Sequence, residues 1–128
     1  MGSGNEALNE SKMTAELLKE FIKANIKTET AIKMINSSLS LKTKREIFST
    51  VDILEINLLN GEMCMFKVGG AQSYIKCSGK FETVFSKSLP IGIIDDIKIT
   101  HIKKNLKDIT KKIFSYQHSH GVLCLYHQ

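Results

Sequence analysis

The 128-residue sequence contains no apolar stretch approaching the ~20 residues that a helix needs to cross a bilayer. Together with the lack of a recognisable signal peptide, this favours a cytoplasmic protein without a membrane segment. Cysteine is also scarce, since Cys64, Cys77 and Cys124 are odd in number and form no C-x-x-C pair. This usage argues against a disulfide framework and is typical of a reducing compartment.

Tryptophan is absent and proline occurs once, while apolar residues make up 42% of the chain and charged residues 24%. These proportions are ordinary for one soluble globular domain. The 18 basic and 13 acidic residues give a net charge of +5, which is too small to indicate nucleic acid as a partner. Much of the excess lies in a late stretch that we expect to form a solvated face: Lys103, Lys104, Lys107, Lys111 and Lys112.

Two helices are predicted in the first third of the chain, because apolar residues recur there at three- and four-residue spacing. Asn25 is the expected stop of the first helix, and Thr28 the expected cap of the second. The two apolar faces should pack on a sheet. They contain Leu8, Leu18 and Ile22 in the first helix, and Ile32, Ile35 and Leu39 in the second.

After Thr43 the pattern changes to that of strands. The segment IFSTVDILEINLL is apolar on both alternating faces, so we expect it to be covered on both sides. Asn60-Gly61 predicts a two-residue type I′ turn between strands that end near Leu59 and begin near Glu62. Further strands are expected at SYIKC, KFETVF and IKITHI, which together predict an α+β fold with an antiparallel meander.

The opening residues Met1, Gly2, Ser3 and Gly4 allow three interpretations. A phosphate-binding loop is disfavoured, because the G-x-G-x-x-G spacing, a preceding strand and a Walker lysine are all missing. A cloning scar is credible, since small residues after Met often come from expression vectors. The third interpretation, the second half of a metal-binding turn, depends on the rest of the sequence.

Five blocks occur in an order and at a spacing that resemble the phosphatase domain of the stage II sporulation protein E family, a bacterial branch of the PPM-type, metal-dependent protein serine/threonine phosphatases. They are MGSGNEALNES, AIKMINSSLSL, FSTVDILEINLLNGE, FKVGGAQSYIK and KSLPIGIID. The resemblance runs from Met1 to about Leu106. It implies a partial αββα sandwich, with a helical switch region over residues 1–41, antiparallel strands over 45–106 and a divergent tail over 107–128.

The resemblance also implies an activity, which is dephosphorylation of a phosphoserine on an anti-sigma factor antagonist to activate a sporulation sigma factor. In that family two Mn²⁺ or Mg²⁺ ions activate a water, and carboxylates hold the ions. The family's opening block reads D-G-M-G-S/N-G, with the ligand Asp two residues before the position of Met1. The later S-D-G block corresponds to Ser119-His120-Gly121, which puts His120 at an Asp position. We therefore expect no intact metal or catalytic site, and no metal bound by this chain.

The remaining acids do not offer an obvious replacement. We interpret Asp52, beside Thr50 on one face of a strand, as a buried, hydrogen-bonded acid. Asp95 and Asp96 are expected to be solvated in a loop, and Asp108 has no assigned role. In the tail, His118, His120, Cys124 and His127 make a weak zinc alternative, because their spacing matches no standard zinc module.

Two hypotheses follow. The chain is a segment of a serine phosphatase whose parent is membrane-anchored with a cytoplasmic phosphatase domain, or it is a catalytically inactive relic that acts as a binding or regulatory module. The partner implied by the resemblance is a phosphorylated anti-sigma factor antagonist, and a homodimer is also possible. The inventory of metal ligands separates the two hypotheses and favours inactivity.

Overall fold

The computed structural model describes residues 4–41, 49–70, 72–77, 80–105, 109–115 and 122–127. The chain forms two compact units. The helical unit comprises Met1–Ser49 and Ile91–Ile97, and the strand unit comprises Thr50–Pro90 and Lys98–Gln128. Within the described residues, no helix combines the length and the apolar character needed to pass through a bilayer.

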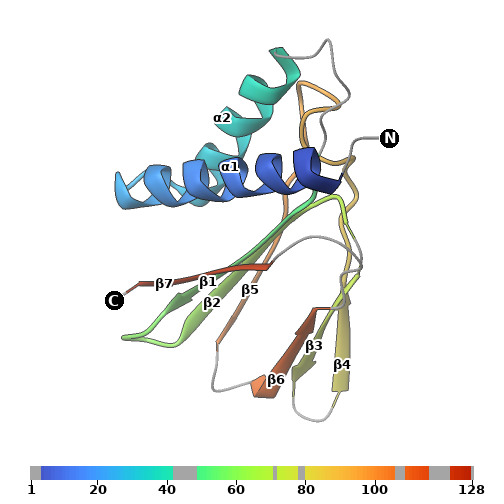
Figure 1. Cartoon of the computed structure of the whole chain (residues 1–128). Coiled ribbons are helices and arrows are strands. Elements are labelled where there is room, and N and C mark those ends of the chain that lie inside the picture. Colours follow the sequence, from blue (N-terminus) through green and yellow to red (C-terminus); the bar gives the residue numbers. More distant parts are fainter. Residues whose placement is uncertain are drawn as a thin grey trace. The chain divides into compact units, whose positions relative to one another are not determined.

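The helical unit contains both predicted helices, α1 (Gly4–Lys23) and α2 (Thr28–Leu41), which appear in blue and teal in Figure 1. Their predicted apolar positions are buried at Leu18, Ile32 and Ile35, with 3%, 1% and 2% of their surface exposed. Glu16 and Lys19 form an exposed ion pair of 3.7 Å on the outer face of α1. The periodicity therefore located buried positions in both helices, although Ile22 and Leu39 are only half-buried and the burial of Leu8 lies outside the described residues. The packing of the helices on a sheet stays a prediction.

Asn25 ends α1, as its sequence position indicates. Its φ of 60° lies in the left-handed region, which asparagine tolerates better than most residues. The Asn25 amide donates to the Ile22 carbonyl at 3.0 Å, and the Ile26 amide donates to the Phe21 carbonyl at 3.0 Å. These bonds are the two that define a Schellman C-cap, and they satisfy carbonyls that the end of the helix would otherwise leave open.

The strand unit contains two sheets, which agrees with the two β layers of the sandwich that the resemblance implies, whereas the expected antiparallel meander is interrupted because β2 and β3 lie in different sheets. One sheet has the order β5-β2-β1-β7 and the other has the order β4-β3-β6 (Figure 1). The chain leaves the first sheet after β2 and starts the second sheet at β3. The strands are β1 (Val51–Asn57), β2 (Glu62–Val68), β3 (Ser73–Cys77), β4 (Lys80–Val84), β5 (Thr100–Asn105), β6 (Ile109–Ser115) and β7 (Val122–His127).

Two strand assignments differ from the sequence-based expectation. The strand expected over IKITHI begins later, because β5 starts at Thr100 and continues to Asn105. The tail, which the family resemblance marks as divergent, contains β6 and β7, and β7 pairs with β1 in parallel. The fold is therefore α+β with two helices and mainly antiparallel sheets, plus one parallel strand pair.

The turn between β1 and β2 is also longer than predicted. Asn57 is the last residue of β1 and Glu62 is the first residue of β2, so the loop has four residues, 58–61, instead of two. Gly61 has a φ of 73°, but Asn60 does not share a positive φ, which excludes a type I′ turn. The reason lies in Asn57, whose Oδ1 accepts a hydrogen bond of 2.9 Å from the Leu59 amide and curls the chain before Asn60 is reached.

The left-handed backbone conformation of Gly61 in this loop can be tested by mutation. We expect Gly61→Val to lower the free energy of unfolding by about 1–2 kcal/mol, because a β-branched residue resists the left-handed region. Urea denaturation of the two proteins measures the difference. Leu58→Val, at an exposed position in the same loop, is the control and should leave the midpoint unchanged. An unaltered midpoint for Gly61→Val would contradict the observed loop geometry.

A hydrophobic core lies between the two sheets of the strand unit. Leu54, Ile56, Met63 and Met65 of the first sheet cluster with Ile75 and Val84 of the second, and Ile102 packs against this cluster. The opposite face of the first sheet is buried too, since Val51, Ile53 and Val68 are at most 5% exposed. This confirms that β1 is covered on both sides. By contrast, large apolar side chains of the second sheet remain exposed, at Tyr74 and Phe81.

Candidate functional site

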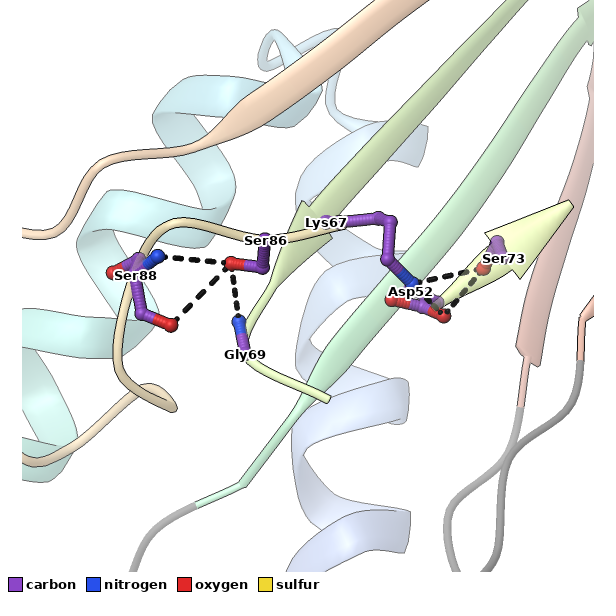
Figure 2. Close-up of polar contacts among 6 residues, drawn as sticks. All are labelled: Asp52, Lys67, Gly69, Ser73, Ser86 and Ser88. Carbon is purple, nitrogen blue, oxygen red and sulfur yellow. Dashed lines mark hydrogen bonds and ion pairs between the residues drawn. The ribbon is translucent and has the colours of Figure 1, made fainter. Parts of the chain in front are cut away.

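The strand unit contains a buried polar triad of Asp52, Lys67 and Ser73. The Lys67 Nζ donates to Asp52 Oδ2 at 2.6 Å and to the Ser73 Oγ at 2.9 Å. The Ser73 hydroxyl in turn donates to Asp52 Oδ2 at 3.5 Å. Lys67 and Ser73 are 0% exposed and Asp52 is 4% exposed. Figure 2 shows the three side chains converging from β2, β1 and the start of β3.

The strand register explains why these side chains meet. Asp52 is paired with Lys67 across β1 and β2, on the face that also carries Leu54 and Met65. Two opposite charges therefore occupy the edge of an otherwise apolar layer. Burying either charge alone would cost several kcal/mol, and the short ion pair together with the serine hydroxyl offsets that cost. Because Ser73 belongs to the second sheet, the triad also joins the two sheets.

A second polar arrangement fixes the corner between β2 and β3. The Ser86 Oγ accepts hydrogen bonds from the Gly69 amide at 2.8 Å and the Ser88 amide at 3.1 Å (Figure 2). Gly69 has a φ of +67°, and a Cβ there would lie 3.0 Å from the Pro90 Cα. Glycine is therefore required at this position both for its backbone conformation and for the close approach of Pro90.

The acids considered as metal ligands do not come together in the structure. Asp52 is buried and paired with Lys67, which confirms its interpretation as a hydrogen-bonded core acid. Asp95 and Asp96 are exposed, as expected for loop acids, and Asp108 lies outside the described residues. Among the residues that the structure describes, no three His, Cys, Asp or Glu side chains form a group that could hold a metal ion.

The other predicted site residues lie mostly at the two ends of the chain. Met1, Gly2 and Ser3 are outside the described residues, whereas Gly4 is the first residue of α1. His118 and His120 are outside the described residues as well, and Cys124 and His127 belong to β7. The zinc alternative therefore stays a prediction.

The late lysine cluster is only partly a solvated face. Lys103 is exposed, but Lys104 is 27% exposed and its Nζ lies 2.7 Å from the Glu82 Oε2 of β4. This pair joins β5 of the first sheet to β4 of the second. The other members, Lys107, Lys111 and Lys112, have no described side chains.

Comparisons with known proteins give a consistent result. The family model described as stage II sporulation protein E matches residues 1–111. The stage II sporulation protein E of Priestia megaterium is 38% identical over 107 residues, which cover 84% of this chain and 18% of that protein. The Bacillus subtilis (strain 168) protein of the same name is 39% identical over 107 residues, covering 84% of this chain and 13% of its own length.

The fold agrees with a solved structure. That structure contains the PP2C phosphatase domain and a fragment of the regulatory domain of the cell fate determinant SpoIIE from Bacillus subtilis. It is 37% identical and superimposes with a TM-score of 0.61, covering 80% of this chain and 31% of the solved chain. The chain thus spans less than a third of that structure and less than a fifth of the two curated relatives. With a family model matching residues 1–111, the chain belongs to the stage II sporulation protein E family.

Proposed function

We propose that the chain contributes the helical and central sheet portion of a PPM-type protein serine phosphatase domain. The observation that carries this proposal is the fold, which matches a PP2C phosphatase domain with a TM-score of 0.61 at 37% identity. The proposed substrate of the complete protein is a phosphoserine on an anti-sigma factor antagonist, whose dephosphorylation activates a sporulation sigma factor. This substrate follows from the family resemblance.

The residues described here do not fit the pair of Mn²⁺ or Mg²⁺ ions that the family resemblance implies. Such ions need several carboxylate oxygens at one place. Asp52, the one buried acid among the described residues, is neutralised by the ammonium group of Lys67 at 2.6 Å. Asp95 and Asp96 are exposed on a loop and form no metal-binding group with other described residues. We therefore assign no catalytic step to this chain.

The role that remains for this chain is structural support of the domain. The two sheets share a packed core and are joined by the triad of Asp52, Lys67 and Ser73. In the family resemblance, α1 and α2 form the switch that sets the geometry of the metal site. The sheets would then supply the scaffold that supports this switch.

The second candidate is a catalytically inactive binding or regulatory module. The observation that favours it is the absence of a metal-binding group among the described residues of the chain. Such a module could still bind the phosphorylated anti-sigma factor antagonist, or pair with a second copy as a homodimer. Binding without turnover, measured by calorimetry with a phosphoserine protein, distinguishes this candidate from an active phosphatase.

The proposed lack of a metal site predicts the outcome of a simple assay. With Mn²⁺ present, the 128-residue chain should hydrolyse p-nitrophenyl phosphate no faster than buffer does, since water is not activated without bound ions. A matched variant carries Asp-Gly before Met1 together with His120→Asp, and should bind Mn²⁺ more tightly in a titration. Metal-dependent turnover that copurifies with the unmodified chain would contradict the prediction.

A further inference from the structure

The side chain of Asn36 makes three hydrogen bonds, and all three go to the backbone of one distant loop. Its Nδ2 donates to the Ile94 carbonyl at 2.8 Å and to the Asp95 carbonyl at 3.0 Å. Its Oδ1 accepts a hydrogen bond of 2.9 Å from the Gly92 amide. Asn36 is 0% exposed, so water does not compete for these bonds. An amide group offers two N–H donors and an oxygen that can accept two hydrogen bonds, so both donors and one of the two acceptor positions are used here.

The loop that Asn36 binds has little else to determine the shape of its tip. Ile91 and Ile97 are buried at its two ends, with 1% and 4% exposed. Between them, residues 93–96 are exposed, and Gly92 adopts a φ of 92°. The tip therefore has no side-chain core of its own. Its backbone groups are held by an amide from α2, which lies more than fifty residues earlier in the chain.

The division of the chain into two compact units agrees with these hydrogen bonds. The segment Ile91–Ile97 belongs to the same compact unit as the two helices, whereas the residues on either side of it belong to the strand unit. Ile91 is further tied to the helical unit by two backbone hydrogen bonds with Ser49, of 2.8 and 3.1 Å. In sequence, this segment connects β4 to β5.

We propose that Asn36 is a positioning residue that makes the loop Ile91–Ile97 move with α2. A displacement of α2 must carry the loop along or break three hydrogen bonds to buried or partly buried groups, which is unfavourable without replacement partners. The loop lies within the connection between β4 and β5, so this connection contains a segment that is bound to α2. The loop and α2 move together in this way whether or not the chain takes part in catalysis.

Amide hydrogen exchange of the full 128-residue chain, followed by NMR, tests the proposal. In the unmodified protein, the Gly92 amide should exchange at the same opening rate as the amides in the middle of α2. Asn36→Leu should speed exchange at Gly92 by on the order of tenfold or more while α2 stays protected. Ser37→Ala, at the adjacent exposed position of α2, is the matched control and should change neither.

A second variant tests the bonds separately. Asn36→Asp keeps an oxygen that can accept from Gly92 but has no N–H for the two carbonyls. The Gly92 amide should remain protected, while the carbonyl ¹³C resonances of Ile94 and Asp95 shift. The proposal is overturned if Gly92 exchange is unchanged in Asn36→Leu. It is also overturned if protection falls equally in α2, the loop and β1, because Asn36 would then be only a core residue.

Discussion

Lys67→Met is expected to lower the free energy of unfolding by about 3–5 kcal/mol, which is a large part of the stability of a domain this size. Methionine has a similar length and fits an apolar layer. The loss arises because the carboxylate of Asp52, 4% exposed, would stay buried without the ammonium group that lies 2.6 Å away. Thermal and urea denaturation measure the effect. In the same experiment Lys103→Met, at an exposed site on β5, should change stability little.

The double variant Asp52→Leu/Lys67→Met separates the cost of a buried unpaired carboxylate from the net contribution of the ion pair. Removing both charges eliminates the buried unpaired group, so most of the lost stability should return. A double-mutant cycle then gives the coupling energy between the two side chains. If Lys67→Met and Lys103→Met had equal effects, or if the double variant were no more stable than Lys67→Met, the ion pair would not be a determinant of stability.

Truncation of the central strand should be nearly as damaging. Ile53 is 1% exposed in the middle of β1, on the face opposite to Asp52 and Leu54. Ile53→Ala is expected to cost about 2–5 kcal/mol, since it removes buried methyl groups and leaves a cavity. Leu59→Ala is the matched control, because Leu59 is 82% exposed in the β1–β2 loop. Similar melting temperatures for the two variants would show that Ile53 is not in the core.

The helices and most strands could be predicted from sequence because their signals are local. The three- and four-residue spacing located the buried faces of α1 and α2, and Asn25 located the end of α1. The division into two sheets could not be predicted in this way. Whether β3 continues the first sheet or begins a second depends on the corner at Gly69, which is set by contacts with Ser86 and Pro90 more than fifteen residues later.

The triad of Asp52, Lys67 and Ser73 was not predicted because the turn between β1 and β2 is longer than the predicted one. A two-residue turn at Asn60-Gly61 pairs Leu59 with Glu62 and would place Asp52 opposite Gly69. The observed four-residue loop moves the register by two positions and places Asp52 opposite Lys67. A two-residue shift keeps every side chain on its own face, so the hydrophobic pattern does not reveal the error. The sequence did contain one signal for the ion pair, which is an aspartate and a lysine in two neighbouring strands that are otherwise mostly apolar.

Asn36 was also missed, because its role depends on a loop far away in the sequence. It lies in the apolar stripe of α2 beside Ile35, and a polar residue at such a position signals a buried hydrogen-bonding role. The sequence does not show which backbone groups it binds. By contrast, the exposed positions of Asp95 and Asp96 were correctly predicted, because paired acids next to glycine and proline are typical of loops.

The discontinuous helical unit has a consequence for synthesis of the protein on the ribosome. Met1–Ser49 emerges first, but Ile91–Ile97, which Asn36 binds, follows only after residues 50–90 have been translated. At about 5–20 residues per second, this interval lasts roughly 2–8 seconds. During that time the buried amide of Asn36 has no loop to bind and the inner face of α2 is incomplete. Until translation has reached β5, the nascent helices therefore expose to chaperones the part of α2 that the loop will later bind.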